Sequence, residues 1–452
     1  MEPEDYSPSL THRGGTLLKT PHGRDQGGSP ACPARSLRLF RNPAVTNRWL
    51  ILADDLTGAA DSGIAFARRG LPTLVAWGLA PVPGEAPVVA LDAGSRSLPA
   101  GQAADRHAAL LRAHGRPSTA LFKKMDSTLR GQPAAEIAAM LSALRTGGQP
   151  ALAVVAPAFP ATGRTTEGGR VRLAGAPLEE SALWERDHSY PSADVPAVLA
   201  SAGIAARLVG LVTLRNDAAG ALQGAIADGV AAVVCDAVEQ GDLEALAHAG
   251  LGLGERLLWA GSGGLAAAIA SALPRRPAAR LAVSPPRGGA LVVVGSRAAS
   301  SRAAVAAVER DGVATWDLPP AWLEGRDARI GAIAREVSNA LAAGQDVLVR
   351  LGEGPQPDSA ALAVSLAAAL APALEPMGSL FATGGDTARA LLDQLGARSL
   401  RLVEEVEPGV PLALAEGARR VLVVTKAGAF GDAGTIRRSL GRLRELTQEH
   451  HP

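Results

Sequence analysis

The sequence predicts an α/β protein with two domains, each built around a mostly parallel β-sheet. From residue 48 onward, short apolar runs that suit buried strands alternate with segments of helical periodicity, which is the pattern of βαβ units. The chain has 452 residues, enough for roughly two or three domains. A proline-rich, basic stretch interrupts the alternation. We therefore expect a first domain over 48–272, a linker over 273–289 and a second domain over 290–446.

Composition excludes several classes of protein. The net charge is +1 and aromatic residues make up only 3%, which argues against nucleic acid or an anionic membrane as a partner. Two cysteines support neither a disulfide framework nor a cysteine-based zinc site. The longest apolar run, 360–374, is broken by Pro372 and is too short to span a bilayer. The N-terminus lacks the pattern of a signal peptide, so we expect a cytoplasmic protein.

The elements of the first domain follow from apolar periodicity. Residues 1–47 are rich in Gly, Pro, Ser and Arg, lack an apolar face and are expected to be a disordered extension. Strands are expected at 49–52, 71–77, 88–91, 119–123 and 151–156, and helices before Gly70, at 99–114 with Ser97 as a cap, and at 133–144. Alternation then pauses over 157–191, and an insert of this length is usually a functional loop or a lid.

A hairpin is expected inside this insert, over Arg170 to Pro177. Alternation resumes with segments at 208–214, 218–227, 230–235 and 257–259. In the second domain, strands are expected at 290–294, 346–350, 379–382, 400–403 and 421–425, with helices between them. No repeat of fixed period is present.

Two adjacent carboxylates, Asp54 and Asp55, stand where the first strand hands over to a helix. In parallel sheets this is the edge at which ligands bind. Neighbouring carboxylates repel, so they need a cation, a hydrogen-bond donor or a ligand hydroxyl. The alternative is an aspartate that caps the helix beside a solvated one.

A second cluster, Lys123 to Gly131, follows another predicted strand. It brings together two lysines, Arg130, Asp126 and two hydroxyls, which suits a small anionic ligand that carries hydroxyl groups. A solvated turn before a capped helix is the alternative. Arg96 follows a neighbouring strand and Arg164 lies in the insert, so both could line the same pocket.

Three small-residue loops each precede a helix in the second domain, at Gly295-Ser296, Thr383 to Ala388 and Lys426 to Asp432. Backbone N–H groups in such loops, together with helix N-termini, can bind phosphates. Asp386 could hold Mg²⁺ there, directly or through water. The three loops together indicate a nucleotide site.

Two familiar nucleotide motifs are not supported. Gly261 to Ala266 fits G-x-G-x-x-A, but a dinucleotide site requires an acidic residue about 20 positions later, and 281–286 contains none. A Walker A loop needs lysine after glycine, and no lysine here follows a glycine.

The chain resembles the four-carbon acid sugar kinase family over about residues 48–445. The resemblance rests on the following ordered motifs: Ala53 to Gly58, Lys124 to Gly131, Ala156 to Pro160 with Gly163 to Thr165, Gly295-Ser296, Thr383 to Thr387, and Lys426 to Gly431. It implies an N-terminal domain that binds the sugar acid, a C-terminal domain that binds ATP, and an active site in the cleft between them.

The resemblance also implies roles for residues. The acid would be held by Asp54 or Asp55, by Arg96, and by Lys124, Met125, Asp126 and Ser127, with Arg130 and Arg164 beside them. ATP would be held by Ser296, Gly384, Gly385, Asp386, Thr387 and Gly428. Lys124 and Arg130 would neutralise the acid or the transferred phosphoryl group, Asp55 or Asp126 would accept the hydroxyl proton, and Lys426 would face the nucleotide phosphates. Similar sequences often have threonine a few residues after Gly-Ser. In this chain the corresponding stretch, Arg297 to Ser301, contains arginine, two alanines and two serines, and no threonine.

The expected activity is ATP- and Mg²⁺-dependent phosphorylation of the terminal hydroxyl of threonate, erythronate or 3-oxo-tetronate. A kinase of another small acid, such as glycerate, is one alternative. A sensor that binds sugar acid or nucleotide without turnover is another, and a dehydrogenase is a third. The sequence leaves the oligomeric state open, with a homodimer as one option.

Overall fold

The computed structural model describes residues 48–79, 82, 85–184, 188–253, 257–277, 287–325, 327–352, 359–428 and 430–448. All of them belong to one unit, Arg41–Pro452. The expected extension over 1–47 lies outside the described residues, as does most of the predicted linker between 278 and 286.

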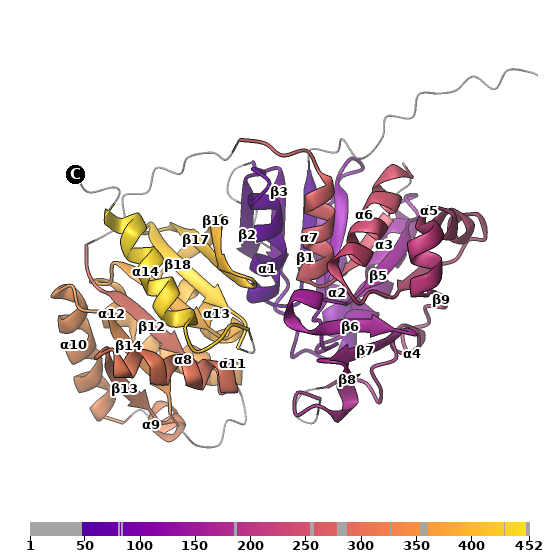
Figure 1. The fold of residues 1–452 in the computed structure, drawn as a ribbon. Coiled ribbons are helices and arrows are strands. Elements are labelled where there is room, and N and C mark those ends of the chain that lie inside the picture. The colour runs from indigo at the N-terminus through magenta and orange to yellow at the C-terminus, as the bar shows by residue number, and fades with distance from the viewer. Residues whose placement is uncertain are drawn as a thin grey trace, which may run out of the picture. The chain divides into compact units, whose positions relative to one another are not determined.

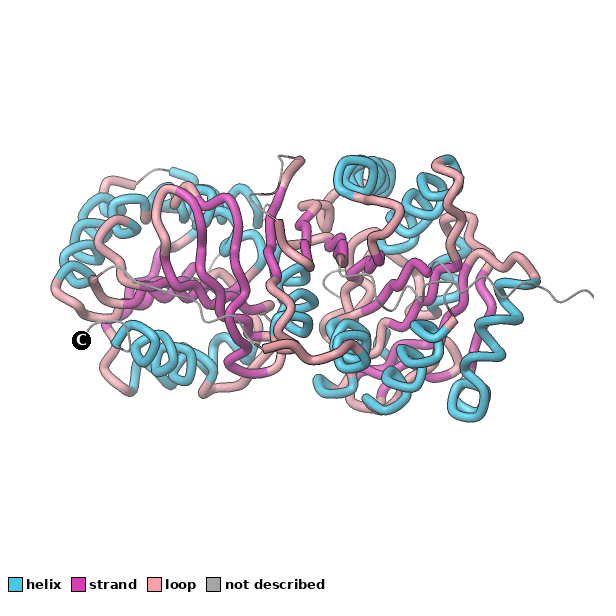
Figure 2. Tube along the Cα trace, turned by 90° about the horizontal axis from the view of Figure 1, so that it is seen from above, coloured by secondary structure: helices cyan, strands magenta, loops and turns pink. Residues whose placement is uncertain are grey.

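The first half of the chain contains βαβ units, as predicted. Its strands and helices are β1 (Trp49–Ala53), α1 (Leu56–Ala67), β2 (Thr73–Trp77), β3 (Val88–Asp92), α2 (Ala100–His114), β4 (Ala120–Lys124), α3 (Pro133–Thr146), β5 (Leu152–Ala156), α4 (Val195–Ala200), β9 (Ala206–Val209), α5 (Leu211–Ala227), β10 (Ala232–Cys235), α6 (Gln240–Gly252), β11 (Leu257–Gly261) and α7 (Gly263–Ala272). Helices cover both faces of the strands (Figures 1 and 2). Most of these strands are therefore buried on both faces and largely apolar, and the edge strand β9 is an exception.

The second half repeats this architecture and adds a long antiparallel hairpin. Its elements are β12 (Ala290–Val294), α8 (Ala299–Arg310), β13 (Ala314–Leu318), α9 (Pro320–Gly325), α10 (Arg329–Ala342), β14 (Val347–Leu351), α11 (Ser359–Ala369), α12 (Ala371–Leu374), β15 (Ser379–Thr383), α13 (Gly385–Gln394), β16 (Ala397–Glu407), β17 (Val410–Gly417), β18 (Val421–Lys426) and α14 (Thr435–Gln448). The hairpin consists of β16 and β17.

The described strands of the two halves form one continuous sheet of 15 strands. The order is β13-β14-β12-β15-β18-β17-β16-β2-β3-β1-β4-β11-β5-β10-β9. The junction is the antiparallel pairing of β16 with β2, in which Leu400 is opposite Val75. The fold class is therefore the predicted one, but the two sheets are joined edge to edge.

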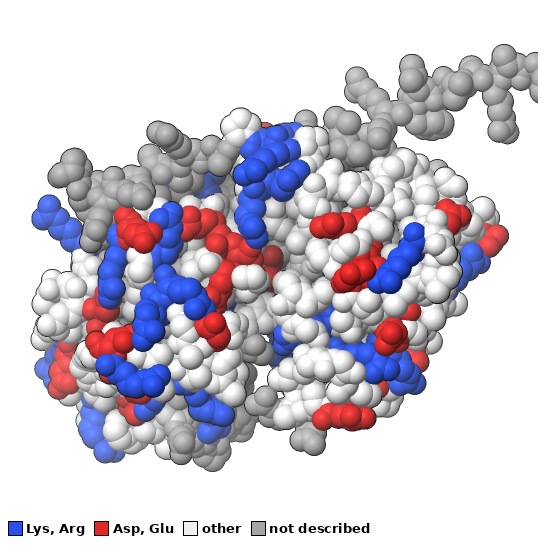
Figure 3. Space-filling view, in the orientation of Figure 1, with Lys and Arg blue, Asp and Glu red and all other residues white. Residues whose placement is uncertain are grey.

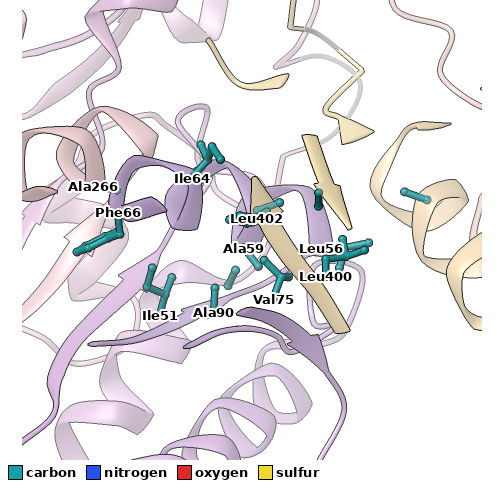
Figure 4. Close-up of a cluster of buried hydrophobic side chains, with 14 of the residues drawn as sticks. Ile51, Leu56, Ala59, Ile64, Phe66, Val75, Ala90, Ala266, Leu400 and Leu402 are labelled. Carbon is teal, nitrogen blue, oxygen red and sulfur yellow. The ribbon is translucent and has the colours of Figure 1, made fainter. Parts of the chain in front are cut away.

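Apolar packing reinforces this junction. Leu400 and Leu402 of β16 belong to the same buried cluster as Leu56 of α1 and Val75 of β2 (Figure 4). A Cβ atom added at Gly63 of α1 would lie 2.9 Å from Cδ1 of Leu402, so a larger residue there would have to push the Leu402 side chain aside. Helix α1, which begins at the adjacent aspartates, is thus packed against both halves of the chain.

Several expectations about elements are wrong in detail. The segment 208–214 is not one strand, because β9 ends at Val209 and α5 begins at Leu211. Ser97 does not cap α2, whose N-cap residue is Pro99, without a side-chain hydrogen bond. Strands β13 and β17 were not predicted, and the strand expected at 400–403 is the longer β16. Half of the β16 side chains are only partly buried, and its sequence alternates apolar with charged residues, so it lacks the apolar run used to find strands.

The expected hairpin in the insert is present. Strands β6 (Arg164–Glu167), β7 (Arg170–Leu173) and β8 (Ala176–Pro177) form a small antiparallel sheet. No helix in the described part of the chain combines the length and apolar character needed to cross a membrane. Basic and acidic side chains are interspersed on the face drawn in Figure 3, in keeping with the net charge of +1.

Candidate active site

The two adjacent aspartates at the end of β1 share one arginine. The guanidinium of Arg96 binds Asp54 through Nε at 2.7 Å and Nη2 at 3.0 Å, and it forms an ion pair with Asp55 through Nη1. Burial alone would raise the pKa of Asp54, but Arg96, with smaller effects of Lys123 and Lys124, lowers it to about 2. The repulsion expected from the sequence is thus relieved by a cation that lies about 40 residues later in the chain.

Asp55 is also the N-cap of α1. Its carboxylate accepts hydrogen bonds from the backbone N–H of Gly58 at 2.7 Å and from the hydroxyl of Thr57 at 2.8 Å. The capping interpretation is therefore correct for Asp55. The idea that its neighbour is solvated is wrong, because Asp54 is only 1% exposed.

Asp126 organises the loop after β4. Its carboxylate receives two hydrogen bonds from Arg130, at 2.7 and 3.2 Å, and one from the backbone N–H of Thr128 at 2.9 Å. Burial opposes ionisation, but Arg130 and Arg96 together hold the pKa of Asp126 well below its usual range. The loop contains one non-glycine residue with positive φ, Leu129 at 61°, a strained conformation of the kind found at functional sites.

The two lysines at the end of β4 point to opposite sides of the sheet, as adjacent strand residues must. Lys124 lines the cavity described below. Lys123 is fully buried on the other side and its Nζ lies 2.9 Å from Oε2 of Glu136. The expectation that both lysines converge on one ligand is therefore wrong. Met125 also lies outside the cavity lining, and its side chain is buried in the hydrophobic core.

A cavity lies at the carboxyl ends of these strands, with an empty volume of about 580 Å³ that includes its open mouth. It is lined by Asp55, Thr57, Gly58, Asp61, Arg96, Lys124, Asp126, Ser127, Thr128, Arg130, Phe159, Arg164, Leu183, Ser262, Gly409, Ala427 and Phe430. The last three residues belong to the second half of the chain. Phe430 lies edge-on to Phe159 at 6.0 Å, and the Arg164 guanidinium lies 5.5 Å from the Phe430 ring centre. Both halves of the chain therefore form the cavity.

The three predicted phosphate-type loops pack against one another at the starts of α8, α13 and α14. A Cβ atom on Gly295 would lie 2.0 Å from Oγ1 of Thr387, and one on Gly428 would lie 2.1 Å from Oγ of Ser296. The hydroxyls of Ser300 and Ser301 each donate to the carbonyl of Gly428 at 3.0 Å. The first turn of α8 thus supplies hydroxyl groups next to the Gly295-Ser296 loop, although the threonine of similar sequences is missing.

Lys426 holds its own loop in shape. Its Nζ is within hydrogen-bond distance of Oγ of Ser301 at 3.2 Å, the carbonyl of Gly428 at 3.2 Å and the carbonyl of Phe430 at 2.9 Å. Burial lowers its pKa to about 8. In this arrangement the ammonium is directed at carbonyl oxygens of the loop, and the expected contact with phosphates would require these bonds to change.

The first turn of α13 carries the candidate metal ligand. Asp386 is exposed there, beside Gly384 and Gly385, which are partly buried. Among the residues that the structure describes, no group of three or more His, Cys, Asp or Glu side chains is arranged to hold a metal ion. A cation at Asp386 would therefore need most of its ligands from a bound nucleotide and water.

Two polar cavity residues, Asp61 and Ser262, lie outside the predicted site motifs and were missed from the sequence. Asp61 was overlooked because it lies in the middle of a helix, although it follows the paired aspartates on the same element. Ser262 was set aside with the false dinucleotide motif. Its hydroxyl donates to the carbonyl of Ala158 at 2.6 Å and accepts from the N–H of Gly264 at 3.0 Å, which caps α7 at the cavity wall.

Comparisons with known proteins match the whole described fold. A family model for a sugar-binding N-terminal domain matches residues 49–269, and one for a nucleotide-binding C-terminal domain matches residues 291–436. A solved structure from Salmonella typhimurium LT2 has a TM-score of 0.74 at 23% identity and covers 88% of this chain and 100% of its own. One from Haemophilus influenzae has a TM-score of 0.68 at 22% identity, with 87% and 100% covered. These two similarities support the fold.

Curated relatives are more similar in sequence. A D-threonate kinase from Cupriavidus necator is 41% identical over 86% of this chain and 96% of its own length. A D-threonate kinase from Bordetella bronchiseptica is 36% identical, with 87% and 97% covered. A 3-oxo-tetronate kinase from Methylobacterium radiotolerans is 32% identical, with 87% and 98% covered. The chain belongs to the four-carbon acid sugar kinase family.

Proposed function

We propose that this protein is an ATP-dependent kinase that phosphorylates the terminal hydroxyl of a four-carbon sugar acid, such as threonate, erythronate or 3-oxo-tetronate. One observation carries the proposal: the cationic cavity of the first half is closed by Gly409, Ala427 and Phe430, which lie on or beside the phosphate-type loops of the second half. An acid held in the cavity would have its far end close to a nucleotide on those loops. Phosphoryl transfer depends chiefly on such positioning and on charge stabilisation.

Two cavity cations are suited to the acid's carboxylate. The Nζ of Lys124 lies 3.9 Å from Asp61, beyond hydrogen-bond distance. Arg164 is only 8% exposed, and its buried Nε has no hydrogen-bond partner among the residues that the structure describes. An unpaired buried donor is costly, and a ligand oxygen would satisfy it. Arg130 and Arg96 already bind carboxylates, and we assign them to shaping the pocket around Asp126 and Asp54.

The nucleotide side of the proposal rests on the three helix N-termini and the loops before them. Backbone N–H groups there favour phosphate oxygens. Mg²⁺ is usually bound by one or two carboxylates together with substrate phosphates, and Asp386 could supply one such carboxylate. When bound, the ion would neutralise charge on the phosphates. Because ATP is a cytoplasmic metabolite, we place the activity in the cytoplasm.

A panel of small acids incubated with ATP and Mg²⁺ tests the proposal. The panel should contain both enantiomers of threonate and erythronate, a 3-oxo-tetronate and glycerate. We expect a terminal phosphate ester from at least one four-carbon acid and little ATP hydrolysis without acid. Preferred turnover of glycerate would favour the alternative of a kinase for another small acid. Binding of an acid without formation of any product would favour a sensor.

A further inference from the structure

Three carboxylates line the cavity, and two of them are already occupied. Both oxygens of Asp55 accept hydrogen bonds from Gly58, Thr57 or Arg96. Both oxygens of Asp126 are bound by Arg130, with Thr128 on the first. A base that removes a proton needs a lone pair directed at its substrate. These two aspartates, which the sequence suggested for that role, are instead engaged in holding the pocket together.

Asp61 differs from both. None of the hydrogen bonds within the described part of the chain ends on its carboxylate, and its nearest cation is Lys124 at 3.9 Å. The side chain is 7% exposed, and it faces the cavity from the second turn of α1. Asp61 is therefore the cavity carboxylate whose oxygens remain available to a ligand hydroxyl.

The surroundings of Asp61 keep this space open. A Cβ atom on Gly263, at the start of α7, would lie 2.5 Å from its Oδ2, so a larger residue there would push the carboxylate from its present position. The charged groups that act on it are Lys124 from β4, Asp55 at the start of its own helix, Asp126 from the loop after β4, and Glu405 from β16. Glu405 belongs to the second half of the chain, so both halves contribute charge around Asp61.

We infer that Asp61 is the general base of the proposed kinase, and this inference rests on the proposed function. Its carboxylate takes the proton of the acid's terminal hydroxyl as that oxygen bonds to the γ-phosphorus. The bond between the γ-phosphorus and the bridging oxygen breaks, its electron pair leaves with ADP, and the proton passes from Asp61 to water after product release. The products are the phosphate ester, ADP and one proton, which balances the step.

The acidity of Asp61 suits this role. Burial raises its pKa to about 6, Lys124 acts in the opposite direction, and Glu405, Asp55 and Asp126 raise it further. A base with a pKa just below neutral pH is mostly ionised there and still holds a proton well enough to accept one. We therefore expect kcat to rise with pH up to about 6 and then to level off.

The test compares Asp61→Asn with Asp126→Asn and with Asp105→Asn, an exposed position on α2. With an acid that the wild-type protein phosphorylates, Asp61→Asn should lower kcat by about 10²- to 10⁴-fold. Its affinity for the acid, measured by calorimetry without ATP, should stay within about threefold of wild type. Its remaining kcat should no longer show the acidic limb, the rise with pH up to about 6 that is expected for wild type. Asp126→Asn should chiefly weaken acid binding and keep the limb, and Asp105→Asn should change neither.

A kcat for Asp61→Asn within about threefold of wild type would overturn the inference, as would a limb that survives in Asp61→Asn and disappears in Asp126→Asn. If Asp61→Asn does not fold, Gly263→Ala is the second variant, because it keeps the Asp61 carboxylate but crowds it. Gly263→Ala should lower kcat about tenfold or more. An unchanged kcat in this variant would count against Asp61 as the base. Failure of the wild-type protein to phosphorylate any acid would overturn the proposed function itself, a different outcome from activity that survives without Asp61.

Discussion

The carboxylate of Asp55 lies directly against the backbone of Gly385, and a Cβ atom on that glycine would stand 2.9 Å from Oδ2 of Asp55. Asp55 begins α1 in the first half of the chain, and Gly385 begins α13 in the second half. The aspartate motif of the proposed sugar-acid side thus touches the loop before α13 on the proposed nucleotide side. Adding one methyl group at Gly385 can test how closely these two segments must fit.

Gly385→Ala should lower kcat/KM by about ten- to a hundredfold, because the new methyl group displaces Asp55 and a shift of about 1 Å can cost two orders of magnitude in rate. Steady-state kinetics would measure the loss, and thermal unfolding would show whether the fold is kept. Gly331→Ala is the matched control, since a Cβ atom there meets nothing within 4 Å. Equal activity in the two variants would mean that Asp55 can move without cost.

Lys124→Arg should lose about a hundredfold in turnover. Only four of the 45 basic Lys and Arg residues in this chain are lysines, so a lysine retained at the cavity suggests a need for a compact charge. The side chain is 5% exposed, and a Cβ on Gly58 would lie only 3.4 Å from its Nζ, which leaves little room for a planar guanidinium. Arg145→Lys, on an exposed turn of α3, is the reverse exchange and should be neutral. Near-normal turnover of Lys124→Arg would place the ammonium away from the acid.

Asp386→Asn should weaken nucleotide use and leave acid binding intact. The substitution removes an exposed negative charge at the start of α13, where it could serve as a ligand of Mg²⁺. We expect a higher KM for ATP and a higher Mg²⁺ concentration for half-maximal activity, each measured by titration in the kinase assay. Acid affinity measured without nucleotide should match that of wild type. A loss of acid affinity equal to the loss of nucleotide affinity would contradict the assignment of the two ligands to separate halves.

Asp92→Asn should change how stability depends on pH. Asp92 ends β3 and pairs with Arg389 of α13 at 2.9 Å, yet burial outweighs this pairing and raises its pKa from 3.8 to about 7. The folded protein then holds this proton more tightly than the unfolded chain. Protonated Asp92 therefore adds to the free energy of unfolding below about pH 4, and this stabilisation is lost as the pH rises through about 7.

The stability difference between wild type and Asp92→Asn should therefore decline from pH 4 to pH 8, by up to a few kcal/mol. Urea unfolding across this pH range measures it. The exposed Asp105→Asn variant should show a constant difference. A wild-type advantage that grows with pH would mean that the ion pair with Arg389 outweighs the burial of Asp92.

Much of this protein could be predicted from local patterns. Apolar runs such as Trp49 to Leu52 locate parallel strands, because a strand buried on both faces contains few polar residues. The strand ends then locate the polar clusters, since parallel strands bring their carboxyl ends to one edge of the sheet. By contrast, β16 was located only in part, because a strand with half its side chains only partly buried does not form a continuous apolar run.

Local patterns in the sequence were enough to predict the α/β class, the polar groups at strand ends and the resemblance to a kinase family. The partner of each polar group could be seen only in the folded chain. Period-two alternation separates Lys123 from Lys124, but which of them meets the cavity depends on which helices cover each face of β4. Likewise, Arg96, which follows β3, neutralises Asp54, which follows the adjacent β1. Within the described residues no hydrogen bond reaches the carboxylate of Asp61, and its nearest cation is Lys124 at 3.9 Å. Such pairings join residues far apart in the chain, and their geometry exists only once the sheet has formed.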